Sequence, residues 1–420
     1  MITFIMALSY QKRLISSIDK VMVNLMKAGH YAWVIVAVGV LVKMACLGFG
    51  RFAYSLLLPY MRTSLDFNYS QMGLLSGGIL LGYLLFSFIG GVLATRFGLK
   101  RVIIASLLCS SISMFSISRL SLFFPLFVST FAMGAAAAGA HISMTILPMA
   151  WFDQRTVGRA VGIVIGGSGL GILLTGILVP YLLTDGGKEA WRVCWLLLAS
   201  ITFAVAVISA FLLKETPRER EIPVSEPAKG VALSPLKSDH LSLRAIIVIY
   251  FIFGFSYIIY ATYFPAIMVE EIHLSEKSAG DIWAIFGWMC MVSGLVWGFL
   301  SDRFGRRKAL LWNNALISLS VLLPLCLHQP LVLGLSAFLF GFTFLGTVTV
   351  IAASVGDQVG EKRASTYGLV TLIHGIGQFL GTTSGGTLKD LTGSFQITLL
   401  SSFIGFILCL ILIVLGKKRS

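Results

Sequence analysis

Residues 298–308 read GFLSDRFGRRK, and residues 91–101 read GVLATRFGLKR. The two stretches lie 207 positions apart and share a Gly, a Leu, an Arg-Phe-Gly triplet and a final basic residue. Each follows one long apolar run and precedes another, so each marks a short, positively charged turn between two hydrophobic segments. A charged turn that recurs in this way indicates that the chain contains a duplicated unit.

Three further pairs of segments match at nearly the same offset. Residues 48–59 share Gly, Phe, Tyr and Pro with residues 254–265, residues 131–134 share Phe and Gly with residues 338–341, and residues 153–160 share Asp-Gln and Arg-Ala with residues 357–364. Four matches at offsets of 204 to 207 predict a six-helix unit that occurs twice. Because six is an even number, both copies have the same orientation across a membrane, as in parallel repeats.

The composition places this duplicated unit in a membrane. Hydrophobic side chains make up 57% of the 420 residues and charged ones 12%, about half the charged fraction of a water-soluble chain. A soluble enzyme is therefore excluded. Long apolar runs such as 404–415 favour helices over the alternating segments of a β-barrel. We predict an all-α membrane protein with twelve spans at 32–60, 71–94, 102–118, 122–150, 157–183, 191–213, 244–268, 278–300, 309–327, 330–355, 364–388 and 395–416.

The basic residues indicate the orientation of these spans. Of the 32 Lys and Arg residues, 24 fall in the tails and in alternate loops on one face, which the positive-inside rule assigns to the cytoplasm. The net charge of +14 is thus a topology signal, and no nucleic-acid partner is expected. We expect a multi-pass protein of the plasma membrane, the inner membrane if the source is bacterial, with both termini cytoplasmic.

Charged stretches also indicate the domain boundaries. A central cytoplasmic loop, 214–243, divides a first bundle at 31–213 from a second at 244–416, and a cytoplasmic tail occupies 417–420. Residues 1–30 have the spacing of an amphipathic helix lying in the membrane interface. The alternative for this segment is that translation starts at Met22 or Met26.

Two sequence motifs resemble a known family. The stretch from Gly298 to Lys308 resembles the loop signature of the major facilitator superfamily, and GFGRFAYSLLLPYM (48–61) is similar to the first helix of its YbfB/YjiJ-like branch. The resemblance covers nearly the whole chain. It implies two parallel six-helix repeats, a rocker-switch transporter with a central site between the halves, a small-molecule substrate, the lipid bilayer as surroundings, and a monomer without a cofactor.

The first span contains two cations and no carboxylate, namely Lys43 and Arg51. A cation this deep in a bilayer costs about 2.5–3.5 kcal/mol on insertion scales, so each needs a partner or a wet cavity. Eight residues of α-helix turn the two side chains about 80° apart, so both could border one cavity. No Asp or Glu lies deep in any predicted span, and we expect the counter-ion to be the substrate, an organic anion such as a carboxylate. The alternative is that Arg51 bonds backbone carbonyls and Lys43 extends towards the interface.

Aromatic and imidazole side chains supply further candidates. First and seventh helices line the cavity in the resembled family, so the resemblance adds Tyr54, Tyr257 and Tyr260 to the substrate site. His141 and His374 are the only histidines deep in the predicted spans, and an imidazole titrates near neutral pH. They are the candidates for coupling transport to protons, together with Gln378, one turn after His374. Packing is the alternative role for every one of these residues.

The charged turns are interpreted as conformational latches. In the second copy Asp302 accepts hydrogen bonds while basic side chains hold the cytoplasmic ends of neighbouring helices. The second latch comprises Asp302, Arg303, Gly305, Arg306, Arg307 and Lys308, and the first comprises Gly91, Arg96, Gly98 and Arg101. Thr95 stands at the Asp position of the first copy, which predicts that the first latch is uncharged.

Missing motifs narrow the function. The six cysteines lie in apolar segments without a CxxC pair, which predicts neither disulfides nor a metal site. No nucleotide-binding motif is present, so secondary transport is expected rather than ATP hydrolysis or other enzymatic activity. The leading hypothesis is a proton-coupled transporter of a small organic anion. The alternatives are an exporter of amphipathic or drug-like compounds, against which Thr130 and a Pro-free 173–176 argue, and a non-transporting receptor.

Overall fold

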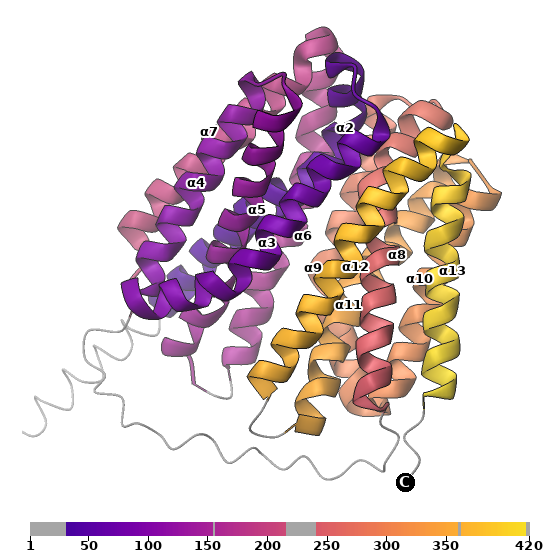
Figure 1. Ribbon diagram of the computed structural model, residues 1–420. Coiled ribbons are helices and arrows are strands. Elements are labelled where there is room, and N and C mark those ends of the chain that lie inside the picture. Colours follow the sequence, from indigo (N-terminus) through magenta and orange to yellow (C-terminus); the bar gives the residue numbers. More distant parts are fainter. Residues whose placement is uncertain (1–30, 154–155, 216–240, 360–362, 417–420) are drawn as a thin grey trace, which may run out of the picture.

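The structure, a computed structural model, describes residues 31–153, 156–215, 241–359 and 363–416. Its helices form two bundles that lie side by side (Figure 1). The predictions for residues 1–30 and 417–420, and for most of the central loop, fall outside the described residues.

Twelve long helices run through the described residues. The first extends over Tyr31–Leu65 and contains the π-helical segment η1 (Met44–Phe52) and α2 (Ala53–Leu65). The other eleven are α3 (Tyr69–Phe97), α4 (Leu99–Arg119), α5 (Phe123–Ile146), α6 (Val157–Gly186), α7 (Ala190–Leu212), α8 (Leu243–Ala266), α9 (Glu276–Phe304), α10 (Arg306–Cys326), α11 (Pro330–Val359), α12 (Arg363–Thr392) and α13 (Phe395–Leu415). Short helical turns extend three of them, namely η2 (Leu147–Ala150), η3 (Gly187–Glu189) and η4 (Ile267–Glu271).

The helix α12 differs from the others in composition. Eleven helices of the described chain are long and apolar enough to cross a membrane, and α12 is not among them. It has 30 residues, which is long enough, but His374, Gln378 and a series of Gly and Thr lower its hydropathy. Among the described helices, the one without a sufficiently apolar stretch is thus one that packs against the other bundle.

The duplication is visible in the local geometry. Gly98 and Gly305, in the two charged turns, have φ of 90° and 94° and ψ of 150° and 149°. Residues with a side chain rarely adopt this region, which explains a glycine at both positions. The matched helices α3 and α9 have 29 residues each, and α4 and α10 have 21 each. The two halves are therefore parallel repeats, as the sequence predicts.

The halves meet along three helix pairs: α3 with α12, α6 with α9, and α2 with α8. Missing side chains let the backbones approach closely. A Cβ on Gly73 would lie 2.6 Å from the Thr382 carbonyl oxygen, and one on Gly169 would lie 2.6 Å from that of Gly287. Glycine thus determines how closely the two halves can pack.

The end of the molecule where α2 meets α3 is closed; it is the upper end in Figure 1. There Arg62 forms an ion pair with Glu270 at 3.2 Å. The Asp390 carboxylate of α12 accepts hydrogen bonds from Tyr69 N at 2.9 Å and from Ser70 N at 2.6 Å, in the first turn of α3. Both interactions connect one half to the other, and we call this set the upper lock.

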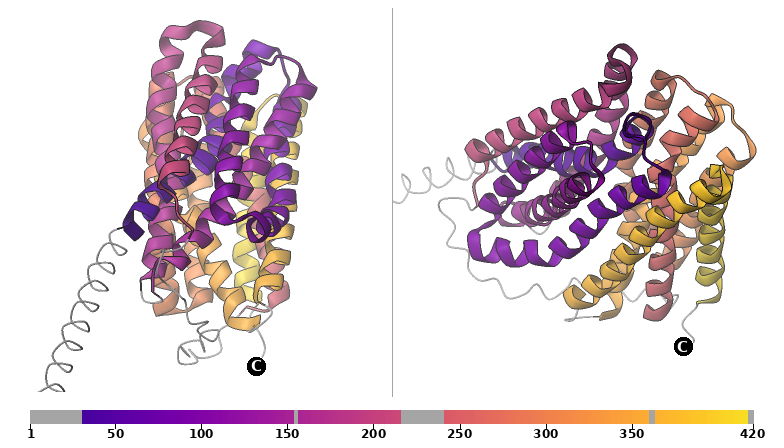
Figure 2. Two further views of the ribbon diagram at one scale, coloured as in Figure 1. Left: turned by 90° about the vertical axis from the view of Figure 1, so that its left-hand side faces the viewer. Right: turned by 45° about the horizontal axis from the view of Figure 1, so that its top comes forward.

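The halves separate towards the lower end, where α13 finishes (Figures 1 and 2). Leu84 of α3 still contacts Gly375 of α12. One turn further down α3, the Phe88 side chain is 80% exposed, and a Cβ on Gly368 of α12 would meet nothing within 4 Å. The contact between α3 and α12 therefore ends before the lower end is reached. The predicted topology makes this lower end cytoplasmic.

Candidate functional site

The segment between Lys43 and Arg51 is a π-helix, Met44–Phe52. The Ala53 N–H bonds the Gly48 carbonyl, five residues earlier, instead of the usual four. A close approach fixes the segment, because a Cβ on Gly48 would lie 2.4 Å from the Cα of Gly171 in α6. The α-helical geometry that we assumed for this segment therefore does not apply to it. The two cations have different partners.

Arg51 connects the two halves near the middle of the membrane-spanning region. Its Nη2 donates to the Tyr257 hydroxyl at 2.5 Å and to Gln378 Oε1 at 2.8 Å, on α8 and α12. Its Nε is buried without a hydrogen-bond partner. Within the described residues, no carboxylate bonds the guanidinium. A partly buried cation that has two neutral acceptors and an unpaired Nε is suited to receive an anion.

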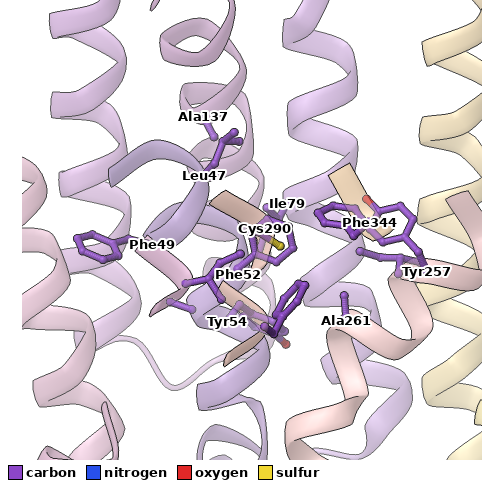
Figure 3. Close-up of a cluster of buried hydrophobic side chains, with 14 of the residues drawn as sticks. Leu47, Phe49, Phe52, Tyr54, Ile79, Ala137, Tyr257, Ala261, Cys290 and Phe344 are labelled. Carbon is purple, nitrogen blue, oxygen red and sulfur yellow. The ribbon is translucent and has the colours of Figure 1, made fainter. Parts of the chain in front are cut away.

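Aromatic rings surround this guanidinium. Its Cζ lies 5.5 Å from the centre of the Phe52 ring and 5.4 Å from that of Tyr83. Phe52 and Tyr257 both pack on Phe344 of α11, with ring centres 5.9 and 4.8 Å apart (Figure 3). Such apolar surroundings strengthen the electrostatic contacts that are made within them.

The space beside Arg51 is small in this conformation. A pocket of about 10 Å³ lies between α2, α3 and α8, which is about the size of one water molecule. Its lining is Arg51, Phe52, Ser55, Ser76, Ile79, Leu80, Ile258, Ala261 and Thr262. An organic solute can enter only after the halves move apart or side chains rearrange.

Lys43, in the first helix, forms a separate cluster with residues of α5. Its side chain is 0% exposed. The Nζ is 2.9 Å from His141 Nδ1, and it donates to the His141 carbonyl oxygen and the Thr145 hydroxyl, each at 2.7 Å. The structure thus brings Lys43 and His141 together, but it does not place Lys43 beside Arg51 as we expected for a shared anion site.

Tyr83 stands between these two groups. Its ring centre lies 6.1 Å from that of His141, and the same ring contacts the Arg51 guanidinium. No signal in the sequence distinguishes Tyr83 from the other tyrosines. Its role as the bridge between the two cationic sites is a result of the tertiary structure.

His374, in α12, stacks on aromatic rings of α8. Its Nδ1 is 2.9 Å from the Tyr250 carbonyl oxygen, which can only accept, so Nδ1 carries a proton. The ring lies 3.8 Å from the Tyr250 ring at an interplanar angle of 7°. Gly254 makes room for it, since a Cβ there would be 2.5 Å from the His374 carbonyl oxygen. Gln378, which we grouped with the proton-coupling candidates, lies at Arg51 instead.

Two of the three tyrosine candidates lie away from Arg51. Tyr54 is 1% exposed and donates to the Met72 carbonyl oxygen of α3 at 2.7 Å. The Tyr260 hydroxyl is 2.6 Å from the Ser336 hydroxyl of α11. Of the tyrosine candidates, the structure brings Tyr257 to the guanidinium. The partners of the other two lie within their own halves.

The second charged turn joins four helices of one half. Arg306 bonds Asp302 and, at 2.9 Å, Asp357 of α11, while Arg307 donates to the carbonyl oxygens of Ile413 and Val414 in α13. These contacts agree with a role for basic side chains at helix ends. Arg303 and Lys308 are exposed, and the Arg303 guanidinium lies over the neighbouring Phe304 ring.

The first charged turn has a carboxylate that its sequence does not suggest. Glu215, just after α7, accepts a hydrogen bond from Lys100 N at 3.1 Å, at the start of α4. The expectation that the first latch is uncharged is therefore wrong, because the carboxylate comes from a residue more than a hundred positions away. Arg96 and Arg101 are exposed, and Gly91 has open space beside it.

Comparison with known proteins agrees with this fold. A family model described as "Uncharacterised MFS-type transporter YbfB" matches residues 43–414. The chain belongs to this family of major facilitator transporters. It is therefore a multi-pass membrane protein of a transporter family, and the family and relatives named here are transporters rather than enzymes.

Individual relatives are distant but cover most of the chain. The hexuronate transporter of Bacillus subtilis is 26% identical over 82% of this chain and 85% of its own. A probable sulfoacetate transporter of Cupriavidus necator is 22% identical, over 84% and 86%. Among solved structures, a mutant of the nucleoside transporter NupG superposes with a TM-score of 0.74 at 15% identity, over 91% of this chain and 100% of its own. The structural likeness shows a shared fold.

Proposed function

We propose that this protein is a secondary active transporter of a small organic anion, and that Arg51 binds the acidic group of the substrate between the two halves. The observation that carries the proposal is the guanidinium itself, which is enclosed by aromatic rings and bonded to neutral acceptors of the other half, and keeps Nε free. Relatives named for hexuronate, sulfoacetate and tartrate transport support an acidic substrate.

Arg51 connects substrate binding to movement of the halves. A carboxylate can take both Nε and Nη2 in a bidentate arrangement, and Nη2 is the atom that now bonds Tyr257 and Gln378. The arriving anion competes with these two acceptors for the guanidinium. Hydrogen bonds to a charged group contribute about 1.5–3 kcal/mol each, so their exchange for substrate bonds can drive a change between conformations.

The proposal extends to topology and energy source. The protein lies in the plasma membrane with its lower end towards the cytoplasm. An ion gradient, in our proposal a proton gradient, drives transport. The distribution of basic residues supports the orientation.

A thermal-shift assay with purified protein tests the substrate class. The probes are D-glucuronate, tartrate and sulfoacetate, with D-glucose as the neutral comparison. We expect at least one anion to raise the unfolding temperature of the wild type, and Arg51→Gln to lose that shift. Arg119→Gln, at an exposed cation on α4, is the matched control and keeps the shift. Stabilisation that persists in Arg51→Gln, or that only lipophilic cations produce, would overturn the proposal and favour an exporter of amphipathic compounds.

A further inference from the structure

We infer that Lys43 and His141 form a proton-binding dyad, the site that carries the coupling proton; this inference rests on the proposed function. Two basic groups share a short N···N contact of 2.9 Å, between a fully buried lysine and a partly exposed histidine. Such a pair can accept one proton more readily than two, because two adjacent cations would repel each other.

The geometry around Lys43 matches an ammonium group. The Thr145 hydroxyl donates to the His141 carbonyl oxygen at 2.7 Å, so its oxygen is free to accept from Nζ. Nζ therefore has three acceptors for its three protons: the Thr145 hydroxyl, the His141 carbonyl and His141 Nδ1. In this state the His141 proton is on Nε2, and Nδ1 accepts.

The alternative state of the dyad has one proton fewer. Lys43 is then a neutral amine, and His141 carries its proton on Nδ1 and donates it to the Nζ lone pair. To return, a hydronium ion gives a proton to Nε2 and becomes water, while the Nδ1 proton passes to Nζ. One O–H bond of the hydronium ion and the N–H bond at Nδ1 break, and N–H bonds form at Nε2 and Nζ, so the dyad gains a single proton and no electrons are exchanged.

Access to the dyad is through the imidazole. Lys43 is 0% exposed, whereas His141 is partly exposed, so a proton reaches the lysine by way of the ring. His374 lacks this arrangement, since its Nδ1 is bonded to a backbone carbonyl oxygen, which cannot take over a proton.

The groups around the dyad allow it to change charge. On the same helix lie Cys46 and Arg51, and α3 contributes Tyr83, beyond which are Tyr257 and Tyr367. The helix α6 has no titratable side chain between Arg159 and Tyr181, and α7 has none between Cys194 and Lys214. Between Arg101 and Arg119, the titratable side chain of α4 is Cys109, which is exposed. No carboxylate of the described residues bonds either member of the dyad. Nothing in the surrounding helices therefore holds the proton permanently.

The Tyr83 ring connects the dyad to the substrate site. It contacts both the Arg51 guanidinium and the His141 ring. An anion bound at Arg51 favours a positive charge on the dyad, and a protonated dyad favours the anion to the same degree. The sign of this coupling predicts symport of a proton with the anion.

Proteoliposomes separate proton coupling from substrate binding. Labelled D-glucuronate, tartrate and sulfoacetate are tested in exchange at equal pH and in net uptake driven by an inward proton gradient. We expect Lys43→Gln and His141→Gln, which keep hydrogen bonding but cannot relay a proton, to retain exchange and lose the several-fold acceleration by the gradient. His374→Gln keeps the acceleration, and Arg51→Gln loses both activities. Retained acceleration in the two dyad variants, or its loss only in His374→Gln, would overturn the inference.

Nitrogen NMR tests the dyad without any substrate. The full-length protein carries ring-labelled histidine, and the His141 signal is assigned by its absence in His141→Gln. We expect the His141 proton to move from Nδ1 to Nε2 as the pH is lowered, and Lys43→Gln to abolish this move. A single tautomer at every pH in the folded wild type would overturn the inference, whether or not any of the three anions is transported. Failure of all anions to exchange in the wild type, with the tautomer change present, would count against the proposed function alone.

Discussion

Removing the Asp390 carboxylate should open the upper end of the protein. This side chain, on α12, accepts hydrogen bonds from Tyr69 N at 2.9 Å, Ser70 N at 2.6 Å and the Ser70 hydroxyl at 2.5 Å, all in the other half. Asn68 caps the next amide, Gln71 N, at 2.8 Å. Asp390 therefore caps the remaining free amides at the start of α3, and this cap exists only while the upper end is closed.

The size of the effect follows from these contacts. Loss of an N-terminal cap costs about 1 kcal/mol, and a carboxylate at an exposed helix N-terminus contributes about 0.3–1 kcal/mol. Because Asp390 is exposed, we take the lower part of the summed range and expect Asp390→Ala to destabilise the closed state by about 1.5 kcal/mol, or roughly tenfold in the equilibrium between closed and open. Asp390→Asn keeps an acceptor and should give a smaller shift.

Distances between spin labels at Asp66 and Lys277 measure this equilibrium in liposomes. Both positions are exposed and lie at the upper end, one on each half. The exposed cysteines Cys109 and Cys326 are replaced first. The long-distance population should grow about tenfold in Asp390→Ala, and Asp281→Ala, at an exposed carboxylate of α9, should leave it unchanged. An unchanged distance distribution in folded Asp390→Ala would refute the assignment of Asp390 to the upper lock.

Three further substitutions test individual contacts. Gly254→Ala places a Cβ 2.5 Å from the His374 carbonyl oxygen and should lower the free energy of unfolding by about 1–3 kcal/mol, which thermal unfolding measures. Gly158→Ala, with open space around the new Cβ, is the control. Equal stability of the two variants would contradict the packing argument. Gly305→Ala has free space but a φ of 94°, so backbone strain should destabilise the protein by about 1–2 kcal/mol; no loss of unfolding temperature would show that the turn can relax. Tyr257→Phe keeps the ring but removes an acceptor from Arg51. Because the anion then meets less competition for the guanidinium, its half-saturation concentration in uptake assays should fall. A rise would indicate that the hydroxyl binds the substrate itself.

Local features of the sequence were enough to predict the helices and their duplication. Apolar runs of about 20 residues, the even number of spans and the repeated charged turn predict two parallel six-helix repeats, and the structure has them. The sequence also located Arg51, because a charge inside an apolar run is conspicuous wherever its partner lies. The weak hydropathy of α12 likewise reflects the His374 and Gln378 that it carries.

Which side chains meet was decided only by the tertiary structure. Tyr257 and Gln378 are 206 and 327 residues away from the Arg51 that they bond, and Asp390 is 321 residues from the helix start that it caps. Hydropathy reports the preference of each helix for lipid, but it does not report how far the helix is rotated about its axis. That rotation depends on close packing at glycines such as Gly48 and Gly171, which also accompanies the π-helical segment. The sequence alone therefore determined that two cations lie in the first helix, and packing decided that one faces the other half while the other binds His141.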